Sequence, residues 1–312
     1  MQTSLLSDPA GLEGEWWLLW HRDPAATPFQ TPAWLVSWRK HFIQGESIIV
    51  AWRSEGRLVG LLPLFELDGR LLPWGAGTSD WLGGLFDPIV DPAEFSGGLA
   101  ALPLPLDLFQ LPSHSPLLHT PIPSGWAARD QQAESCPVLE LPVTASAKMG
   151  QKVRYYRRRA ARAGAGEIER LGSKHLADLI ELHTRRWNRR DEPGIFADSR
   201  VAAWQEEALP ALEAAGLLHL YGIRIAGKIV AALCILGAKQ RRFYYIGGFD
   251  PDHAPLGLGT LLLDHAIGQA QQDGCSSFDF LRGSEPYKYR WGAKDQPSFA
   301  RYLFPARTPA HA

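Results

Sequence analysis

The pattern of hydrophobic and polar positions is clearest between residues 218 and 281. The segment LLHLYGIRIAGKIVAALCIL predicts two strands joined by a tight turn at Ala226–Gly227. A third short strand, RFYYIGG, is followed by the glycine loop APLGLG and by TLLLDHAIGQAQQDG, which predicts a helix ending at Gly274. The next segment, SSFDFL, predicts another strand. A glycine loop that leads into a helix start, where N–H groups lack partners, predicts an anion-binding site.

Apolar positions at helical spacing predict four further helices. The first begins at Thr31–Pro32, the second covers 144–163, the third covers 176–187, and the fourth begins at Asp198 or Ser199 and is kinked by Pro210. Their inward faces are predicted to carry Trp34, Leu35, Trp38 and Phe42; Met149, Val153, Tyr156 and Ala160; Leu176, Leu179, Ile180, His183 and Trp187; and Val201, Trp204, Ala208 and Leu212. The proline-rich stretch 101–123 is predicted to be irregular connecting chain.

An internal repeat relates the two halves of the chain. The segment 48–64 resembles 219–235, an offset of 219 − 48 = 171, which aligns Arg53 with Arg224 and Gly56 with Gly227. The offset persists through a third strand, because LLPWGAG (71–77) falls on RFYYIGG (242–248). Any two hairpins share some likeness, but because the offset persists through a third strand, the repeat favours duplication and predicts two α/β halves of similar plan.

Composition places the chain among ordinary globular proteins. Of its 312 residues 46% are hydrophobic and 21% charged, and the net charge of −1 gives no general attraction to nucleic acid or anionic membrane. Three scattered cysteines do not make a disulfide framework. The longest apolar run, near 229–238, is short of the roughly 20 residues of a membrane helix, and no signal peptide is recognised. We therefore expect a cytoplasmic protein without a membrane span.

Three anion-binding motifs are candidates for the glycine loop. The dinucleotide fingerprint lacks its third glycine, because Leu262 stands there, and no Walker lysine follows the glycines. The acyl-CoA loop of GNAT acetyltransferases, Q/R-x-x-G-x-G/A, is matched by Gly257 and Gly259, although Ala254 replaces its leading Gln or Arg. A glycine-rich turn without a ligand remains the alternative.

The run FDFLRGSEPYKYRWGA (278–293) resembles the closing motif of the CelD-like, cellulose-biosynthesis-associated branch of GNAT acyltransferases, relatives of the Fem aminoacyltransferases. Three other segments are similar to that family: 27–38, 79–88 and 185–198. The resemblance implies an α/β (α+β) fold of tandem GNAT-like domains, each a mixed, mostly antiparallel sheet flanked by helices. The implied domains are 1–143 without a donor loop, a basic linker helix at 144–170, and an acyl-CoA-binding domain at 171–312.

The resemblance implies that acetyl-CoA or another acyl-CoA is the donor and that an amine is the acceptor. After Gly257, the backbone N–H groups of Leu258, Gly259 and Thr260 are expected to hold the donor diphosphate. A backbone N–H near Ile246–Gly248, a segment that contains Gly247, is expected to polarise the thioester carbonyl.

Proton transfer is assigned to the closing motif. Glu285 is the candidate base, Tyr287 the candidate acid and Lys288 a further catalytic candidate. The alternative is structural: Glu285 and Lys288 form an ion pair, and Pro286 begins a short helix. Candidate substrate-binding residues are Asp80, Trp187, Tyr245, Arg282 and Arg290. No metal-ligand constellation is recognised.

The segment 148–170 carries eight basic residues against Glu167 and Glu169. It is either a solvated helix face or a phosphate-binding edge for CoA, a sugar nucleotide or tRNA, with Tyr155 and Tyr156 available for stacking. Three functions follow. The first is acyl-CoA-dependent N-acylation of a sugar, an amino acid or a cell-envelope or polysaccharide precursor. The second is a Fem-type transfer from aminoacyl-tRNA, under which alone we expect a nucleic acid partner. The third is a non-catalytic module of a polysaccharide-assembly system.

Overall fold

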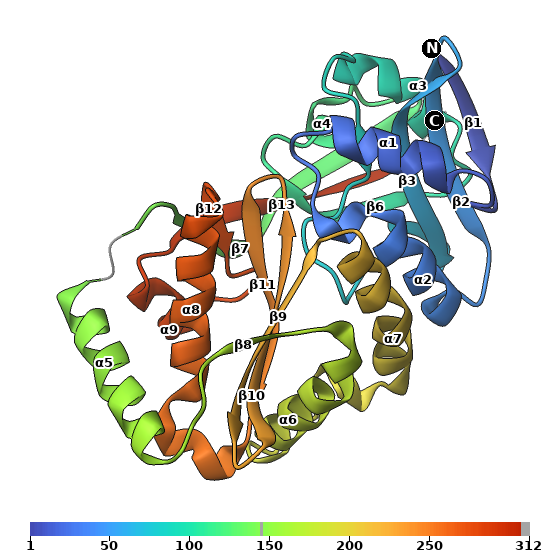
Figure 1. Ribbon diagram of the computed structural model, residues 1–312. Coiled ribbons are helices and arrows are strands. Elements are labelled where there is room, and N and C mark those ends of the chain that lie inside the picture. The colour runs from blue at the N-terminus through green and yellow to red at the C-terminus, as the bar shows by residue number, and fades with distance from the viewer. Residues whose placement is uncertain (144–145, 307–312) are drawn as a thin grey trace. The chain divides into compact units, whose positions relative to one another are not determined.

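The computed structural model describes residues 1–143 and 146–306 (Figure 1). The described residues divide into two compact units, Met1–Ser135 with 297–306, and Cys136–Gln296. The predicted helix at 144–163 begins at two positions that lie outside the described residues. The domain boundaries expected near 143 and 170 stay predictions.

The first unit is built on a mixed sheet in the order β1-β2-β3-β4-β6-β13. Its pairings are antiparallel, apart from the parallel pair β4–β6. Its elements are β1 (Gln2–Leu6), α1 (Glu13–Arg22), α2 (Pro32–Phe42), β2 (Ser47–Ser54), β3 (Arg57–Leu67), β4 (Arg70–Pro73), β5 (Leu85–Phe86), α3 (Ser96–Ala100), β6 (Leu106–Pro112), α4 (Pro116–His119), most of β7 (Trp126–Glu140) and most of β13 (Lys294–Pro305).

The prediction that 101–123 is irregular was wrong, because β6 and α4 lie within it. Leu106 and Leu108 alternate with more exposed residues and are fully buried, as in a strand with one core-facing side. The prolines stand at the ends of this strand, where they remove few ladder hydrogen bonds.

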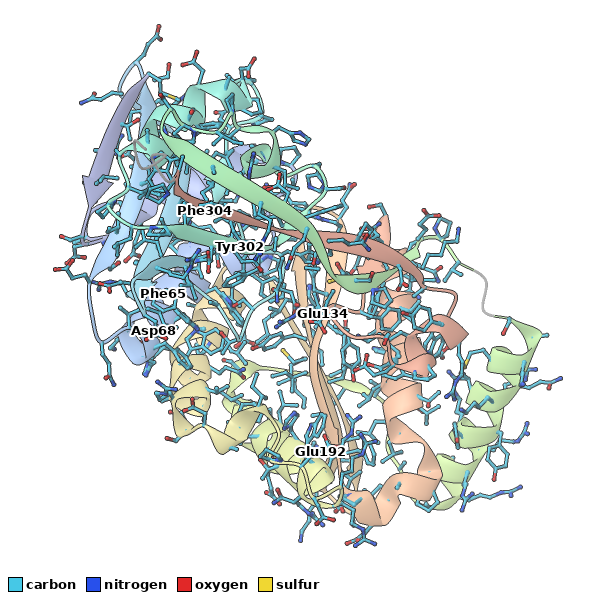
Figure 2. All side chains as sticks on the ribbon, turned by 180° about the vertical axis from the view of Figure 1, so that it is seen from behind. Phe65, Asp68, Glu134, Glu192, Tyr302 and Phe304 are labelled. Atoms are coloured by element: carbon cyan, nitrogen blue, oxygen red, sulfur yellow. The ribbon has the colours of Figure 1, made fainter. Side chains whose placement is uncertain are left out.

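Strand β13 shows the same alternation. Leu303 is buried, whereas its neighbours Tyr302 and Phe304 are more exposed (Figure 2). The guanidinium carbon of Arg129 lies 4.8 Å from the centroid of the Tyr302 ring, so part of this side chain is covered by a cation.

The repeated segments form matching hairpins. Strands β2 and β3 meet at Glu55–Gly56 (φ 50° and 79°), and β9 (Leu218–Ile225) and β10 (Lys228–Ala238) meet at Ala226–Gly227 (φ 48° and 81°). Positive φ at both central residues is the type I′ geometry that suits the twist of the flanking strands. Both predicted hairpins are confirmed.

The second unit carries a sheet in the order β7-β12-β11-β10-β9-β8. Its pairings are antiparallel, apart from the parallel pair β11–β12. The other elements of this unit are α5 (Ala147–Arg162), β8 (Glu169–Leu171), α6 (Leu176–Asn188), α7 (Ser199–Ala214), β11 (Arg241–Phe249), α8 (Leu258–Gln272), β12 (Ser277–Asp279) and α9 (Pro286–Arg290). The mixed, mostly antiparallel strand pairing and the flanking helices confirm the predicted fold class.

Helices cover both faces of the second sheet. Figure 1 shows β9–β11 between α8 on one side and α6 and α7 on the other. Helix α8 buries Leu262, Ala266 and Ala270, and α5 packs on α8. The three cysteines are reduced and buried, with Cys234 at the centre of β10. No described helix combines the length and apolar character needed to cross a membrane.

Candidate active site

Strands β11 and β12 diverge in the middle of the second sheet. They pair in parallel only from Arg241 to Phe243, although β11 continues to Phe249. The pairing with β10 also shifts: Cys234 faces Ile246 and Ile235 faces Tyr244, which leaves Tyr245 as a β-bulge. The bulge falls one residue before the segment predicted for carbonyl polarisation, and that segment follows it on the diverging part of β11.

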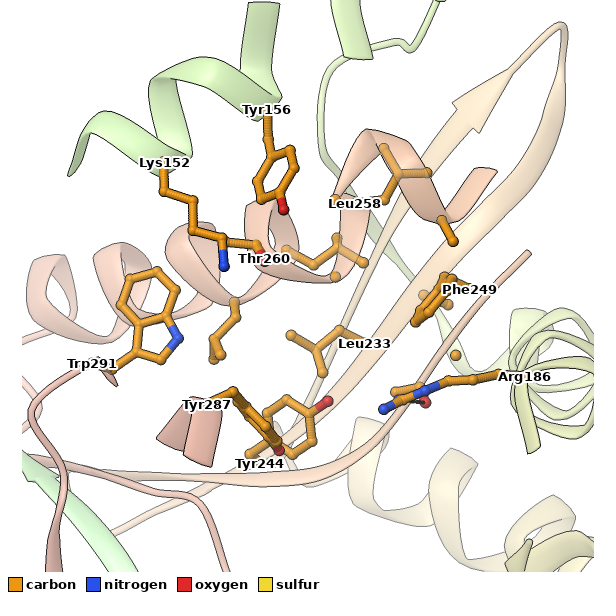
Figure 3. A pocket seen from close by; sticks show the side chains of 18 of the residues that line it. Lys152, Tyr156, Arg186, Leu233, Tyr244, Phe249, Leu258, Thr260, Tyr287 and Trp291 are labelled. Atoms are coloured by element: carbon orange, nitrogen blue, oxygen red, sulfur yellow. Dashed lines mark hydrogen bonds between the residues drawn. The ribbon is translucent and has the colours of Figure 1, made fainter. Parts of the chain in front are cut away.

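A cavity of about 280 Å³ lies at this divergence (Figure 3). Four helices and two strands contribute to its wall. The lining residues are Met149, Lys152, Tyr156, Arg186, Ala232, Leu233, Tyr244, Gly247, Gly248, Phe249, Ala254, Gly257, Leu258, Gly259, Thr260, Leu262, Leu263, Tyr287, Arg290 and Trp291. The glycine loop, the diverging strand and the closing motif therefore meet at one cavity.

The start of α8 presents unpaired amides to this cavity. Gly257 precedes the helix in the left-handed conformation, with φ 67°. Within the described residues, the N–H groups of Leu258 and Gly259 have no backbone acceptor, whereas Thr260 donates its N–H to the Gly257 carbonyl at 2.9 Å. The expectation of three available amides is therefore corrected to two, because the Thr260 N–H closes the first turn.

Gly257 is required by its surroundings as well as by its φ. A Cβ atom built on Gly257 would lie 2.5 Å from ring atoms of Tyr156 on α5, closer than real contacts allow. At Gly259 the nearest atom would be 3.9 Å away, on Phe249. The loop is thus open at Gly259 and covered by an aromatic ring at Gly257.

The cavity wall carries positive charge. Lys152, Arg186 and Arg290 line it, and none of its lining residues is Asp or Glu. In the described part of the chain, none of these three cations has a carboxylate within ion-pair distance. Cations gathered without counter-charges favour an anionic ligand. Together with the two free amides, they fit the diphosphate of a CoA thioester.

Arg186 connects α6 to the diverging strand. Its Nη1 donates to the Gly247 carbonyl at 3.2 Å, and its guanidinium carbon lies 5.2 Å from the Phe249 ring centroid. Its Nε is buried and has no hydrogen-bond partner among the described residues. The guanidinium therefore links α6 to β11 at the cavity wall.

Two tyrosines stand at the divergence. The ring centroids of Tyr244 and Tyr287 are 6.3 Å apart, and both side chains point into the cavity (Figure 3). Burial raises the pKa of both hydroxyls; for Tyr287, the neighbouring Tyr244 and Glu285 raise it further, while Arg186 opposes the rise. Both hydroxyls therefore stay protonated near neutral pH, and each lies within interaction distance of the other.

Lys288 differs from its predicted role. It is buried, and its Nζ donates to the carbonyls of Leu281, Arg282 and Gly283 at 3.0, 2.6 and 3.0 Å. Its Nζ also lies 2.8 Å from Glu285 Oε2. These bonds occupy its three N–H groups, so the ammonium holds the 281–283 loop together and has no N–H group left for a substrate.

Glu285 caps a short helix. It stands at the N-cap of α9, with Pro286 at the first helical position. Its carboxylate is half-exposed, pairs with Lys288 and does not line the cavity. This geometry matches the structural alternative, in which Glu285 pairs with Lys288 and Pro286 begins a short helix. Any role of Glu285 as a base therefore requires a water molecule between its carboxylate and the substrate.

Five other predicted residues do not line this cavity: Ile246, Trp187, Tyr245, Arg282 and Asp80. The Tyr245 hydroxyl accepts a hydrogen bond from Gln205 Nε2 at 3.1 Å, because the bulge turns this side chain towards α7. The Trp187 ring lies 5.8 Å from the His183 ring. Asp80 is buried in the first unit.

Sequence reasoning missed Arg186 as a lining residue. It is one of four arginines in RRWNRR, and its neighbour Arg185 instead pairs with Asp250 at 2.8 Å. No feature of the sequence separates the two. Lys152 and Tyr156 did carry a signal, because their i,i+4 spacing places both on one helix face.

Comparisons with known proteins agree with this geometry. Residues 147–289 match the family model described as an acetyltransferase (GNAT) domain. No curated protein matches the sequence. Among solved structures, FemX is similar with a TM-score of 0.64 and 11% identity over 96% of this chain and 97% of that one.

Two further solved structures share the fold. L-PGS from Bacillus licheniformis has a TM-score of 0.64 and 14% identity over 97% of this chain and 94% of that one. The C-terminal domain of a putative lysylphosphatidylglycerol synthetase from Agrobacterium fabrum has a TM-score of 0.54 and 12% identity over 78% and 81%. Residues 147–289 therefore form a GNAT-fold acetyltransferase domain, and the protein is an acyltransferase enzyme.

Proposed function

We propose that the protein moves an acyl group from acyl-CoA, in the cytoplasm, to an amino group of a sugar, an amino acid or a cell-envelope or polysaccharide precursor. We place it in the CelD-like branch of GNAT acyltransferases. The observation that carries the proposal is the cavity whose wall combines three unpaired cations, two free helix-start amides and no carboxylate. A donor with several phosphate charges satisfies all of these groups at once.

The chemistry fits the elements around the cavity. The acceptor nitrogen attacks the thioester carbonyl carbon, the carbonyl oxygen gains negative charge, and the C–S bond then breaks. An N–H of the segment Ile246–Gly248 is the proposed donor to that oxygen. The protonated Tyr287 is the proposed donor to the departing thiolate. The amine loses its proton to a water molecule, and Glu285 is the proposed acceptor of a proton from that water.

Acyl-CoA binding tests the proposal directly. Isothermal titration calorimetry of the full chain should show saturable binding of acetyl-CoA or a longer acyl-CoA. Thiol release with a panel of amino sugars and amino acids then measures turnover. Failure of the folded protein to bind any acyl-CoA would contradict the proposal.

The role of Tyr287 has a matched control on the same short helix. Tyr287→Phe should lower kcat by roughly 100-fold, the usual size of a general-acid contribution. Tyr289 is exposed and donates to Asp295 at 2.7 Å, so Tyr289→Phe should leave kcat unchanged. Equal effects of the two changes on kcat would contradict a catalytic role for Tyr287.

A second candidate is transfer from aminoacyl-tRNA, as in the Fem relatives. Two observations favour it: the similarity in fold to FemX along nearly the whole chain, and the exposed arginines of α5. Salt-sensitive binding of charged tRNA in a gel shift would support it, and no binding at low salt would exclude it. The match of residues 147–289 to an acetyltransferase domain argues against the non-catalytic alternative.

A further inference from the structure

Helix α5 reaches the cavity although it precedes the strands that build it. Met149, Lys152 and Tyr156 all line the cavity wall. In Figure 3 the side chains of Lys152 and Tyr156 extend from α5 towards Thr260 and Leu258 at the start of α8. The helix therefore faces the amides that are without acceptors.

The position of α5 on α8 is fixed by several contacts. Met149, Val153 and Ala160 are buried in the same core cluster as the inner face of α8. Arg157 Nη2 lies 3.3 Å from Asp264 Oδ2, the ion pair that links the two helices. Lys152 is thus held beside the cavity by the packing of its own helix.

The contacts of Lys152 within the described residues do not explain a lysine at this position. Among the described residues it has no carboxylate partner, and its Nζ lies 5.7 Å from the centroid of the Tyr156 ring. An ammonium group over an aromatic face keeps its N–H groups available for a second partner. The residues after the glycines supply no such charge, because Thr260 and Leu261 stand where a Walker lysine would be.

We propose that α5 is the phosphate clamp of the donor site. Lys152 binds a phosphate of the acyl donor, and the Tyr156 ring, seated on Gly257, covers that phosphate from solvent. The positive charge that a Walker loop carries within itself comes here from a separate helix. This inference rests on the proposed function, since it assigns the residues that recognise its donor.

The test compares two lysines and two donors. Lys148 lies one turn before Lys152 on α5, is exposed and does not line the cavity, which makes Lys148→Met the matched control. Binding is measured by calorimetry with acetyl-CoA, and by competition with acetyl-pantetheine, a thioester without phosphates. Lys152→Met should weaken acetyl-CoA binding about tenfold, the size of one charge-assisted contact, and leave acetyl-pantetheine unchanged.

A second pair of variants tests the ring. Tyr156→Ala should weaken acetyl-CoA binding, Tyr156→Phe should retain it, and Tyr155→Ala, at the exposed neighbouring residue, should have no effect. Thermal melts of each variant separate lost binding from lost folding. Lys152→Gln provides a second variant if the methionine change unfolds the protein.

The failures are distinguishable. If the unmodified protein binds no acyl-CoA, both the proposed function and the phosphate clamp are contradicted. If it binds acetyl-CoA and the two lysine variants behave alike, or if Lys152→Met weakens both donors equally, the clamp alone is overturned.

Discussion

The hairpin β2–β3 of the first unit and the hairpin β9–β10 of the second are built alike, down to their side chains. Arg53 donates to the Gly56 carbonyl at 2.9 Å, and Arg224 donates to the Gly227 carbonyl at 3.0 Å. Each arginine also pairs with a glutamate, Glu15 or Glu169, at 2.5 Å. Corresponding residues thus do the same work in both units.

The two units differ after the third strand. At the offset of the repeat, Gly257 and Gly259 correspond to Phe86 and Pro88. Asp87, between them, is buried and pairs with Arg22 at 2.9 Å and Arg57 at 3.3 Å. The first unit places an acid among its own arginines, whereas the second leaves amides and cations unpaired. The comparison teaches that the first unit neutralises its arginines internally, whereas the cavity of the second unit has cations without a carboxylate partner among the described residues.

The largest effect is expected from putting an acid into the second loop. Gly257→Asp should abolish acyl-CoA binding, by more than about 100-fold, because the carboxylate competes with the donor and its Cβ meets the Tyr156 ring. Calorimetry measures the loss. Gly227→Asp is the control, since Gly227 also has positive φ but has open space around it. Affinity of Gly257→Asp within threefold of normal would contradict the site.

The next effect concerns a close approach of backbones. A Cβ on Gly248 would lie 2.4 Å from the His183 backbone N, which cannot move away without shifting α6. Gly248→Ala should therefore lower the free energy of unfolding by about 3 kcal/mol. Its counterpart by offset, Gly77, has φ 84° and open space, so Gly77→Ala should cost about 1 kcal/mol. Denaturant unfolding gives both values, and equal costs would contradict the comparison.

Acid should destabilise the second unit. Burial lowers the pKa of His183 and of His219 to about 4, and both residues lie in that unit. Because the unfolded value is about 6.5, their contribution is complete above pH ~6.5 and is lost as the pH falls towards 4. Each histidine should account for on the order of 3 kcal/mol.

Unfolding free energies measured from pH 7 to pH 4 check this expectation. His183→Gln should flatten the pH dependence by about one histidine's share, because the variant has no group to titrate. If the unfolding free energy of His183→Gln depends on pH as steeply as that of the unmodified protein, His183 is accessible to protons in the folded state.

The smallest expected effect tests whether the arginines of the two hairpins contribute equally to stability. Arg53→Met and Arg224→Met should each cost less than about 1 kcal/mol, because both ion pairs are partly exposed. The two losses in denaturant unfolding should agree within error. A clear difference would mean that the matching geometry has unequal energetic roles.

Much of the fold was predictable because it depends on local patterns. The hairpin turns follow from Gly56 and Gly227, which stand between two strand-forming runs and adopt positive φ without strain. The start of α7 follows from Asp198, which accepts the N–H of Arg200. The glycine loop and the closing motif were located for the same reason. Each is a contiguous stretch with its own geometry.

The remainder of the site depends on contacts between distant segments. Arg186 and Tyr244 line the cavity because α6 and β11 pack together, and no local pattern reports that packing. Lys288 is a catalytic candidate from the sequence alone, because the sequence cannot show that three carbonyls surround its ammonium. Burial and partner count, the two quantities that decide such roles, exist only in the folded chain.

The buried cysteines have a chemical consequence for an enzyme that handles thioesters. Cys234 lies in β10 directly after Leu233, which lines the cavity, and because successive side chains of a strand point to opposite faces, its sulfur faces away from the cavity. Burial raises the pKa of this thiol to about 12, and only the thiolate attacks a thioester readily. The protein thereby avoids acylating itself at its own sulfur and keeps the acyl group for the acceptor amine.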